Sequence, residues 1–217
     1  MSDANKAMEY AHKNRERFTK ELSEFIKIES ISTDDAYKAQ VEKAAEWAAG
    51  HLLSIGMENV KLMPTGGHPV VYGDWLKKPG APTVLIYGHY DVQPVDPIEL
   101  WETAPFDATV KGDYLFARGS SDMKGQVMAT LNAVESIMKT GDFPLNLKFM
   151  LEGEEEIGSL NMGNFLPKHK DLFKADFCLN PDAGMLAPDK PSITTGLRGL
   201  MYSELRVYGP SKDLHSG

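Results

Sequence analysis

The sequence predicts an α/β fold with a mostly parallel sheet that is covered by helices. Apolar runs at residues 83–86, 145–151 and 175–179 have the length and composition of buried strands. Helical patterns of apolar residues lie between these runs, at residues 127–138 and 160–173. Strands that alternate with helices are typical of parallel sheets, and acidic residues follow several of the strands, where such sheets bind ligands.

The first 56 residues contain two amphipathic segments that we expect to be packing helices. From Asn5 to Glu29, apolar residues recur at three- and four-residue steps between charged ones. Asp34 or Asp35 can cap a second helix, which carries apolar residues up to Ile55 and ends at Gly56. Three further residues of these segments are interpreted as structural: His12, Trp47 and His51.

The central strand at residues 83–86 carries two candidate site residues at its carboxyl end. Two short β-rich runs, at residues 60–63 and 70–72, precede it as further strands. His89 and Asp91 follow the central strand and lie two residues apart, so both side chains point to one side of an extended backbone. This geometry fits a metal ligand with a carboxylate behind it.

Acidic residues also follow later segments. A short strand at residues 115–117 leads through a turn of small residues to Asp122, for which a helix cap is the alternative interpretation. Four glutamates at residues 152–156 follow the strand at 145–151, where their mutual repulsion is costly unless a cation or a shared proton relieves it. A solvated loop is the alternative there. Asp182 is the third acidic position at a strand end.

The sequence changes character from Ser192 onward. Residues 199–209 alternate between apolar and polar side chains, as a half-exposed strand does. We therefore expect a first domain at residues 1–191 and the beginning of a second domain at residues 192–217.

The composition is that of an ordinary soluble globular protein, with 42% hydrophobic and 25% charged residues among 217. A formal net charge of −8 argues against nucleic acid and anionic membranes as partners. No apolar stretch has the length of a membrane span and no signal-peptide core is present, so we expect a cytoplasmic protein. The single cysteine, Cys178, cannot form an internal disulfide, and we expect it to be buried in a strand.

One imidazole and three carboxylate positions at strand ends form a mixed nitrogen and oxygen ligand set. Such a set suits Zn²⁺, Mn²⁺ or Co²⁺, whereas oxygens alone would indicate Mg²⁺ or Ca²⁺. Two ions roughly 3.5–4 Å apart need a bridging carboxylate, and their joint charge makes a bound water acidic enough to be hydroxide near neutral pH. A neighbouring unligated carboxylate can accept that proton and return it to a leaving amine.

Four motifs resemble the dinuclear-metal peptidase and deacylase family. They are His89-Tyr90-Asp91, Gly119-Ser120-Ser121-Asp122-Met123-Lys124-Gly125, Glu155-Glu156-Ile157-Gly158 and Pro181-Asp182. The family includes cytosolic nonspecific dipeptidase, carnosinase, carboxypeptidase G, acetylornithine deacetylase and succinyl-diaminopimelate desuccinylase. Residues 87–94, 196–199 and 212–217 are most similar to the dipeptidase and carnosinase branch, which implies a dipeptide as the substrate.

The resemblance implies a zinc-peptidase-like catalytic domain with two divalent metal ions, most simply Zn²⁺, with Mn²⁺ or Co²⁺ as alternatives. It implies that His89 and Asp182 bind one ion, that Glu156 binds the other and that Asp122 bridges them. The catalytic domain would occupy residues 1–191. Residues 192–217 would begin an inserted α+β lid and dimerisation domain, which implies a homodimer.

The resemblance also assigns catalytic roles. Asp91 would orient His89 and raise its basicity, and Glu155 would be the general base and acid. The Glu-Glu-x-Gly pattern selects residues 155 and 156, so Glu154 is left to solvent or to support of the site. His215, in the Asp-Leu-His-Ser-Gly motif, would reach across the dimer and stabilise the oxyanion in the partner's active site.

Three hypotheses about function follow. The leading one is a metal-dependent hydrolase that cleaves the peptide bond of dipeptides by means of a metal-bound hydroxide and a glutamate base. The second is a deacylase or desuccinylase of N-acyl amino acids. The third is an inactive fragment or metal-binding scaffold, because the family's return to the catalytic domain and its last histidine ligand have no counterpart in the sequence. A nucleotide-binding module is disfavoured, because Gly112, Gly119 and Gly125 of this chain lack the spacing of a phosphate-binding loop.

Overall fold

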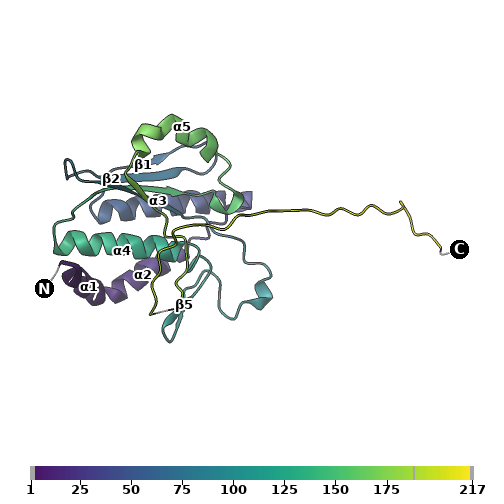
Figure 1. Cartoon of the computed structure of the whole chain (residues 1–217). Coiled ribbons are helices and arrows are strands. Elements are labelled where there is room, and N and C mark those ends of the chain that lie inside the picture. Colours follow the sequence, from purple (N-terminus) through teal and green to yellow (C-terminus); the bar gives the residue numbers. More distant parts are fainter. Residues whose placement is uncertain (1–2, 188, 216–217) are drawn as a thin grey trace. The chain divides into compact units, whose positions relative to one another are not determined.

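The computed structural model describes residues 3–187 and 189–215 and divides into two units, Met1–Gly184 and Met185–Gly217 (Figure 1). All the helices and sheet strands of the described residues lie in the first unit. Within that part of the chain, no helix is both long enough and apolar enough to cross a membrane.

A five-stranded sheet lies at the centre of the first unit, in the order β1-β2-β6-β3-β7. Its strands are β1 (Glu58–Met63), β2 (Val70–Trp75), β3 (Thr83–His89), β6 (Asn146–Glu152) and β7 (Phe177–Leu179). β3 pairs in parallel with β6 and β7, whereas β2 pairs antiparallel with β1 and β6. In this sheet β2 alone therefore runs against the other strands, which confirms the predicted α/β fold with a mostly parallel sheet.

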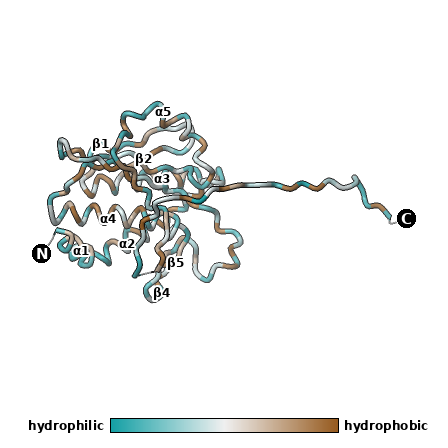
Figure 2. The backbone as a smooth tube through the Cα atoms, viewed as in Figure 1, coloured by the Kyte–Doolittle hydropathy of each residue, from teal (hydrophilic) through white to brown (hydrophobic). Residues whose placement is uncertain are grey.

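Helices cover both faces of the sheet. They are α3 (Lys38–Ser54), α4 (Lys124–Thr140) and α5 (Met162–Phe173). A large apolar core joins α3 and α4 to one face through residues such as Leu52, Leu131 and Phe149, and a smaller core joins α5 to the other face through Tyr72 and Phe165 (Figure 1). Figure 2 shows hydrophobic and hydrophilic colours alternating along α3 and α4, as expected for helices with one buried face.

The prediction of a single helix from Asn5 to Glu29 is wrong, because the chain forms two helices there. They are α1 (Asp3–Lys13) and α2 (Arg15–Ile26). Asn14 separates them with φ −101° and ψ 9°, and its side-chain amide donates a 2.9 Å hydrogen bond to the carbonyl of Tyr10. Asparagine side chains compete with the helix for backbone groups in this way. Both helices pack against α4.

The predicted end of the next helix at Gly56 is confirmed, whereas the predicted cap belongs to a 3₁₀ helix that precedes the α-helix. The Asp34 carboxylate accepts a 2.9 Å hydrogen bond from the backbone N–H of Ala36, which caps the short 3₁₀ helix η1 (Asp35–Tyr37) that leads into α3. Gly56 follows α3 with φ +96°, a backbone region that residues with a side chain rarely adopt.

The strand predicted at residues 115–117 forms, but it does not join the central sheet. β4 (Thr109–Lys111) and β5 (Tyr114–Phe116) pair antiparallel as a separate two-stranded sheet. This sheet follows the long loop that contains the 3₁₀ helix η2 (Ile98–Leu100). Asp122 therefore lies in the turn before α4 and not at the end of a strand of the central sheet.

The expectation of a buried cysteine is wrong. Cys178 is exposed, as are its neighbours Phe177 and Leu179. β7 is the edge strand of the sheet and pairs with β3 on one side only. The three side chains of β7 are exposed, so an apolar run predicted the strand here but not its burial.

The second unit lacks the strand predicted at residues 199–209. Its described residues form one isolated bridge, between Ala187 and Lys190, and the run at 199–209 is irregular in its backbone. Tyr202 and Leu205 are about nine-tenths exposed, at 92% and 90%. A strand needs a hydrogen-bonding neighbour, and none pairs with this run within residues 189–215. The proposed boundary between residues 191 and 192 stays a prediction.

Candidate metal centre

The candidate site lies where three neighbouring strands of the sheet end. β3 ends at His89, which is paired in register with Glu152 at the end of β6. The 3₁₀ helix η3 (Glu155–Ile157) follows β6, and Asp182 follows β7. Because β6, β3 and β7 are adjacent and parallel, their carboxyl ends meet at one edge of the sheet.

His89 is fully buried, and its two ring nitrogens face different surroundings. Nδ1 lies 3.0 Å from the carbonyl oxygen of Asp91 and 3.3 Å from its Oδ1 atom. Both of these atoms are acceptors, so Nδ1 carries a hydrogen. This arrangement directs Nε2 towards the acidic residues and makes it available as a ligand atom.

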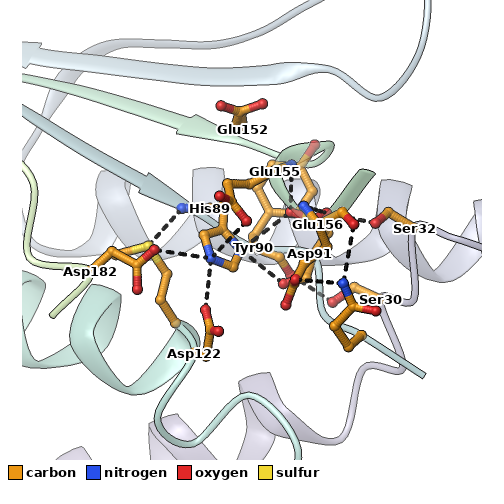
Figure 3. Close-up of polar contacts among 12 residues, drawn as sticks. Ser30, Ser32, His89, Tyr90, Asp91, Asp122, Glu152, Glu155, Glu156 and Asp182 are labelled. Carbon is orange, nitrogen blue, oxygen red and sulfur yellow. Dashed lines mark hydrogen bonds and ion pairs between the residues drawn. The ribbon is translucent and has the colours of Figure 1, made fainter. Parts of the chain in front are cut away.

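Three carboxylates surround Nε2 of His89. It lies 3.0 Å from Oδ1 of Asp122, 3.7 Å from Oδ2 of Asp182 and 3.8 Å from Oε2 of Glu155. Figure 3 shows Asp122 and Asp182 on one side of the imidazole and Asp91 on the other. One ligand atom from each of His89, Asp122 and Asp182 lies within 4.8 Å of the other two, so these residues can surround a single ion.

The electrostatics of this group favour a cation. Burial raises the pKa of Asp182, Glu155 and Glu156, and the negative charge of Asp122 raises all three further. Burial alone would lower the pKa of His89, but the hydrogen bond and charge of Asp91, together with the charges of Glu155 and Asp122, outweigh it and raise that pKa to about 9. Carboxylates that repel one another around an imidazole are stabilised by a divalent ion. The residues present therefore fit a divalent metal.

Asp91 is held by donors from two separate segments. It is fully buried, and its carboxylate accepts hydrogen bonds from the backbone N–H of Glu155 at 3.3 Å and of Glu156 at 3.1 Å. The hydroxyl of Ser32 donates a third, at 2.6 Å. The expected pairing of His89 with a carboxylate behind it is present, at 3.3 Å between Nδ1 and Oδ1.

Glu156 stands beside the three-residue group without being part of it. Its Oε2 atom accepts a 2.8 Å hydrogen bond from the side-chain amide of Gln93, which also donates to the Glu156 carbonyl at 3.1 Å. The structure thus brings His89, Asp122, Asp182 and Glu155 together, and the predicted ligand role of Glu156 stays a prediction.

The other two glutamates of the acidic run point elsewhere. Glu152 is 2% exposed and accepts hydrogen bonds from Tyr87 at 2.8 Å and from Ser159 at 2.9 Å, and Figure 3 shows it apart from the imidazole. Glu154 is 3% exposed and accepts bonds from the amide of Asn161 at 2.9 and 3.0 Å. Of the two alternatives for Glu154, solvent is wrong, because its buried carboxylate ties this loop to the start of α5, and support of the site stays a prediction.

Sequence reasoning assigned no role to two residues that contact the site, Ser32 and Gln93, although Gln93 lies in the motif at residues 87–94. Ser32 is 59 positions from Asp91, and Gln93 is 63 positions from Glu156. Neither residue type suggests metal chemistry, and no local pattern connects them to their partners. His215 lies in the second unit, and its predicted role stays a prediction.

At the carboxyl edge of its parallel strands, this α/β domain brings together His89, Asp182 and, from the turn before α4, Asp122. These three residues define a candidate site for a divalent metal. The chain belongs to Peptidase family M20/M25/M40, whose characteristic sequence matches residues 85–207. The predicted resemblance to a metal-dependent peptidase family is thereby confirmed.

Individual relatives are dipeptidases by name. The chain is 35% identical to the Cys-Gly metallodipeptidase dug1 of Schizosaccharomyces pombe, over 98% of this chain and 48% of that protein. It is 34% identical to the Beta-Ala-His dipeptidase of Mus musculus, over 98% and 46%. The crystal structure of human carnosine dipeptidase 1 superimposes with a TM-score of 0.77 and 30% identity, over 83% of this chain and 41% of the other. The predicted similarity to the dipeptidase and carnosinase branch is confirmed, and the chain spans about half the length of these relatives.

Proposed function

We propose that the protein to which this chain belongs is a metal-dependent dipeptidase. The observation that carries the proposal is the group of Asp122, Asp182 and Glu155 around Nε2 of His89, with distances of 3.0, 3.7 and 3.8 Å. The names of the relatives, Cys-Gly metallodipeptidase and Beta-Ala-His dipeptidase, support a dipeptide as the substrate.

His89, Asp122 and Asp182 would hold one ion, and Asp122 would bridge to a second ion held by Glu156. Zn²⁺ suits this mixed nitrogen and oxygen set, and Mn²⁺ and Co²⁺ are the alternatives. When bound, the ions polarise the peptide carbonyl and lower the pKa of the attacking water. Glu156, whose Oε2 atom accepts a hydrogen bond from Gln93, would be a ligand of the second ion, and Asp91 would keep the imidazole of His89 in the ligating orientation.

Glu155 would move the proton. Its side chain is 39% exposed, whereas that of its neighbour in the site, His89, is fully buried, so the Glu155 carboxylate is accessible to a substrate. It would accept the proton of the attacking water and donate it to the amine nitrogen as the peptide bond breaks. The backbone N–H of Glu155 donates a hydrogen bond to Asp91, the residue that orients His89. The position of the proposed base is therefore tied to that of the proposed ligand His89.

The Asp213-Leu214-His215-Ser216-Gly217 motif supports a further part of the proposal. His215 would donate a hydrogen bond to the developing oxyanion in the partner subunit of a homodimer. Its segment is the beginning of the proposed lid and dimerisation domain.

Hydrolysis of a substrate panel tests the proposal. The full-length protein, loaded with Zn²⁺, is expected to hydrolyse Cys-Gly or β-Ala-His faster than N-acetyl or N-succinyl amino acids. The reverse preference would favour the deacylase alternative. Failure to hydrolyse substrates of either class would contradict the proposal that the protein is an enzyme.

A variant pair tests the assigned base. Glu155→Gln is expected to retain bound metal and to lose turnover by about 10²–10⁴-fold, the usual contribution of a general base. Glu46→Gln, at an exposed position on α3, is the matched control and should keep both properties. Unchanged turnover in Glu155→Gln would remove Glu155 from the mechanism.

A further inference from the structure

We propose that Ser32 is a positioning residue of the metal centre. Its hydroxyl donates a 2.6 Å hydrogen bond to Oδ2 of Asp91 (Figure 3). Asp91 in turn orients the imidazole of His89 through its carbonyl oxygen, 3.0 Å from Nδ1, and through Oδ1, 3.3 Å from Nδ1. This inference rests on the proposed function, because it concerns the same metal site.

Ser32 is the donor to Asp91 that does not belong to the site's own loop. The backbone donors to Asp91 are the N–H groups of Glu155 and Glu156, which lie in η3 and carry two of the proposed functional side chains. These two donors move with the side chains of Glu155 and Glu156, so they cannot hold Asp91 in place independently of η3. The Ser32 hydroxyl, at 2.6 Å from Oδ2, also makes the shortest of the three contacts.

The segment that carries Ser32 is itself fastened to the end of β3. Ile31 forms a parallel bridge with Val92, whose N–H donates a 2.9 Å hydrogen bond to the Ser30 carbonyl. The Ser30 hydroxyl donates a 2.6 Å bond to the carbonyl of Tyr90. Residues 30–32 therefore lie beside residues 90–92 and are held there by one isolated bridge and these two hydrogen bonds.

Further hydrogen bonds join the residues just before this segment, at the end of α2, to the turn that carries Asp122. The ammonium group of Lys124 is fully buried and donates to the carbonyl of Ile28 at 2.6 Å and to that of Phe25 at 3.1 Å. Lys124 is the first residue of α4 and lies two positions after Asp122. The end of α2 is thus held from the same turn that supplies the proposed bridging ligand.

Loss of the Ser32 hydroxyl would free one oxygen of Asp91 from its external donor. The carboxylate could then rotate within the loop of η3, and the imidazole that it orients would lose part of its preorganisation. Groups that orient a metal-binding histidine are typically worth 10–100-fold in metal affinity. Ser32→Ala is expected to weaken Zn²⁺ binding by about this factor.

The test compares three variants by their affinity for Zn²⁺ alone, measured by calorimetry in competition with a chelator. Ser32→Ala removes the hydroxyl, and Ser32→Thr restores it. Ser30→Ala is the matched control, because it removes a neighbouring buried hydroxyl that bonds to Tyr90 and not to Asp91. The absorption spectrum of each variant loaded with Co²⁺ reports the ligand geometry without requiring turnover.

The inference expects weakened Zn²⁺ binding and an altered Co²⁺ spectrum in Ser32→Ala, both restored in Ser32→Thr. Ser30→Ala should unfold at a lower temperature in the chelator but bind Zn²⁺ within about threefold of the wild type. Equal Zn²⁺ affinity in Ser32→Ala and the wild type, or equal weakening in Ser30→Ala, would overturn the inference alone. A wild-type protein that binds no Zn²⁺ would instead overturn the proposed function and this inference with it.

Discussion

Nε2 of His89 lies 3.0 Å from Oδ1 of Asp122, although 33 positions separate the two residues in the chain. His89 ends a strand of the central sheet, whereas Asp122 belongs to the turn before α4. Their contact is therefore made by the packing of α4 against the sheet, and the metal site depends on that packing as much as on its ligands.

Asp182→Asn is expected to change stability in opposite directions without and with metal. In a chelator, the substitution removes one of three carboxylates crowded around His89, and it should stabilise the fold or leave it unchanged, by roughly 1 kcal/mol at most. With Zn²⁺ at about 100 times its Kd, the wild type should gain about 2–3 kcal/mol, and the variant should lose most of that gain. Thermal unfolding in both conditions measures the effect, and a lower stability of the variant in the chelator would contradict the explanation.

Glu135→Gln is expected to destabilise the packing of α1 and α2 on α4. The side chain of Glu135 is 6% exposed. Its carboxylate accepts hydrogen bonds from Arg17 Nη2 at 2.6 Å, from Arg17 Nη1 at 3.2 Å and from the Tyr10 hydroxyl at 2.8 Å. Loss of this buried charge should cost about 1–3 kcal/mol of unfolding free energy, measured by urea denaturation. Glu9→Gln, which breaks an exposed pair with Lys13, is the control and should cost no more than about 0.5 kcal/mol. Equal losses in the two variants would contradict the argument.

His51 is expected to make the stability of the fold fall at mildly acidic pH. Burial lowers the pKa of His51 below its usual 6.5. The negative charges of Glu21 and Glu135 raise this pKa by less than burial lowers it, and the positive charge of Arg17 lowers it further. A group with a lowered pKa binds its proton more weakly in the folded state than in the unfolded state. Its contribution to stability is therefore complete above about pH 6.5 and is lost as the pH falls below that value.

His51→Phe isolates this effect, because an aromatic ring at this position keeps the stack on Trp47, whose centroid lies 5.0 Å away. Urea denaturation at pH 7.5, 6.5 and 5.5 should show a wild type that loses stability relative to the variant as the pH falls. A difference between the two proteins that does not depend on pH would contradict the expectation.

The central sheet was predictable because each of its elements leaves a local signature in the sequence. The apolar run before His89 and the acidic positions after the later strands indicated both the strands and the edge at which they end. The helix break at Asn14 was not predictable from periodicity, because apolar spacing continues across it and the break depends on one side-chain hydrogen bond to Tyr10.

Contacts between distant segments account for the rest. Ser32 and Gln93 are ordinary polar residues in sequence, and their hydrogen bonds to Asp91 and Glu156 form only when the fold brings distant segments together. Cys178 shows the converse, since an apolar run indicates a strand but not whether a helix covers it. The alternation at residues 199–209 likewise indicates strand propensity, which forms a strand only beside a partner.

Gly125→Ala is expected to disrupt the turn that carries Asp122. Gly125 lies in the first turn of α4, and a Cβ atom there would lie 2.0 Å from the carbonyl oxygen of Ser120, which is backbone and can yield only if the turn moves. The variant should lose stability by about 2 kcal/mol or more and should bind Zn²⁺ more weakly, because Asp122 lies within the displaced turn.

Gly163→Ala is the matched control. Gly163 is also near the start of a helix, but a Cβ atom added there would meet no atom within 4 Å. It should therefore gain roughly 0.5–1 kcal/mol from higher helix propensity. Urea denaturation and Zn²⁺ titration of both variants measure these effects, and a Gly125→Ala protein as stable as Gly163→Ala would show that the turn is not held as tightly as the contact with Ser120 requires.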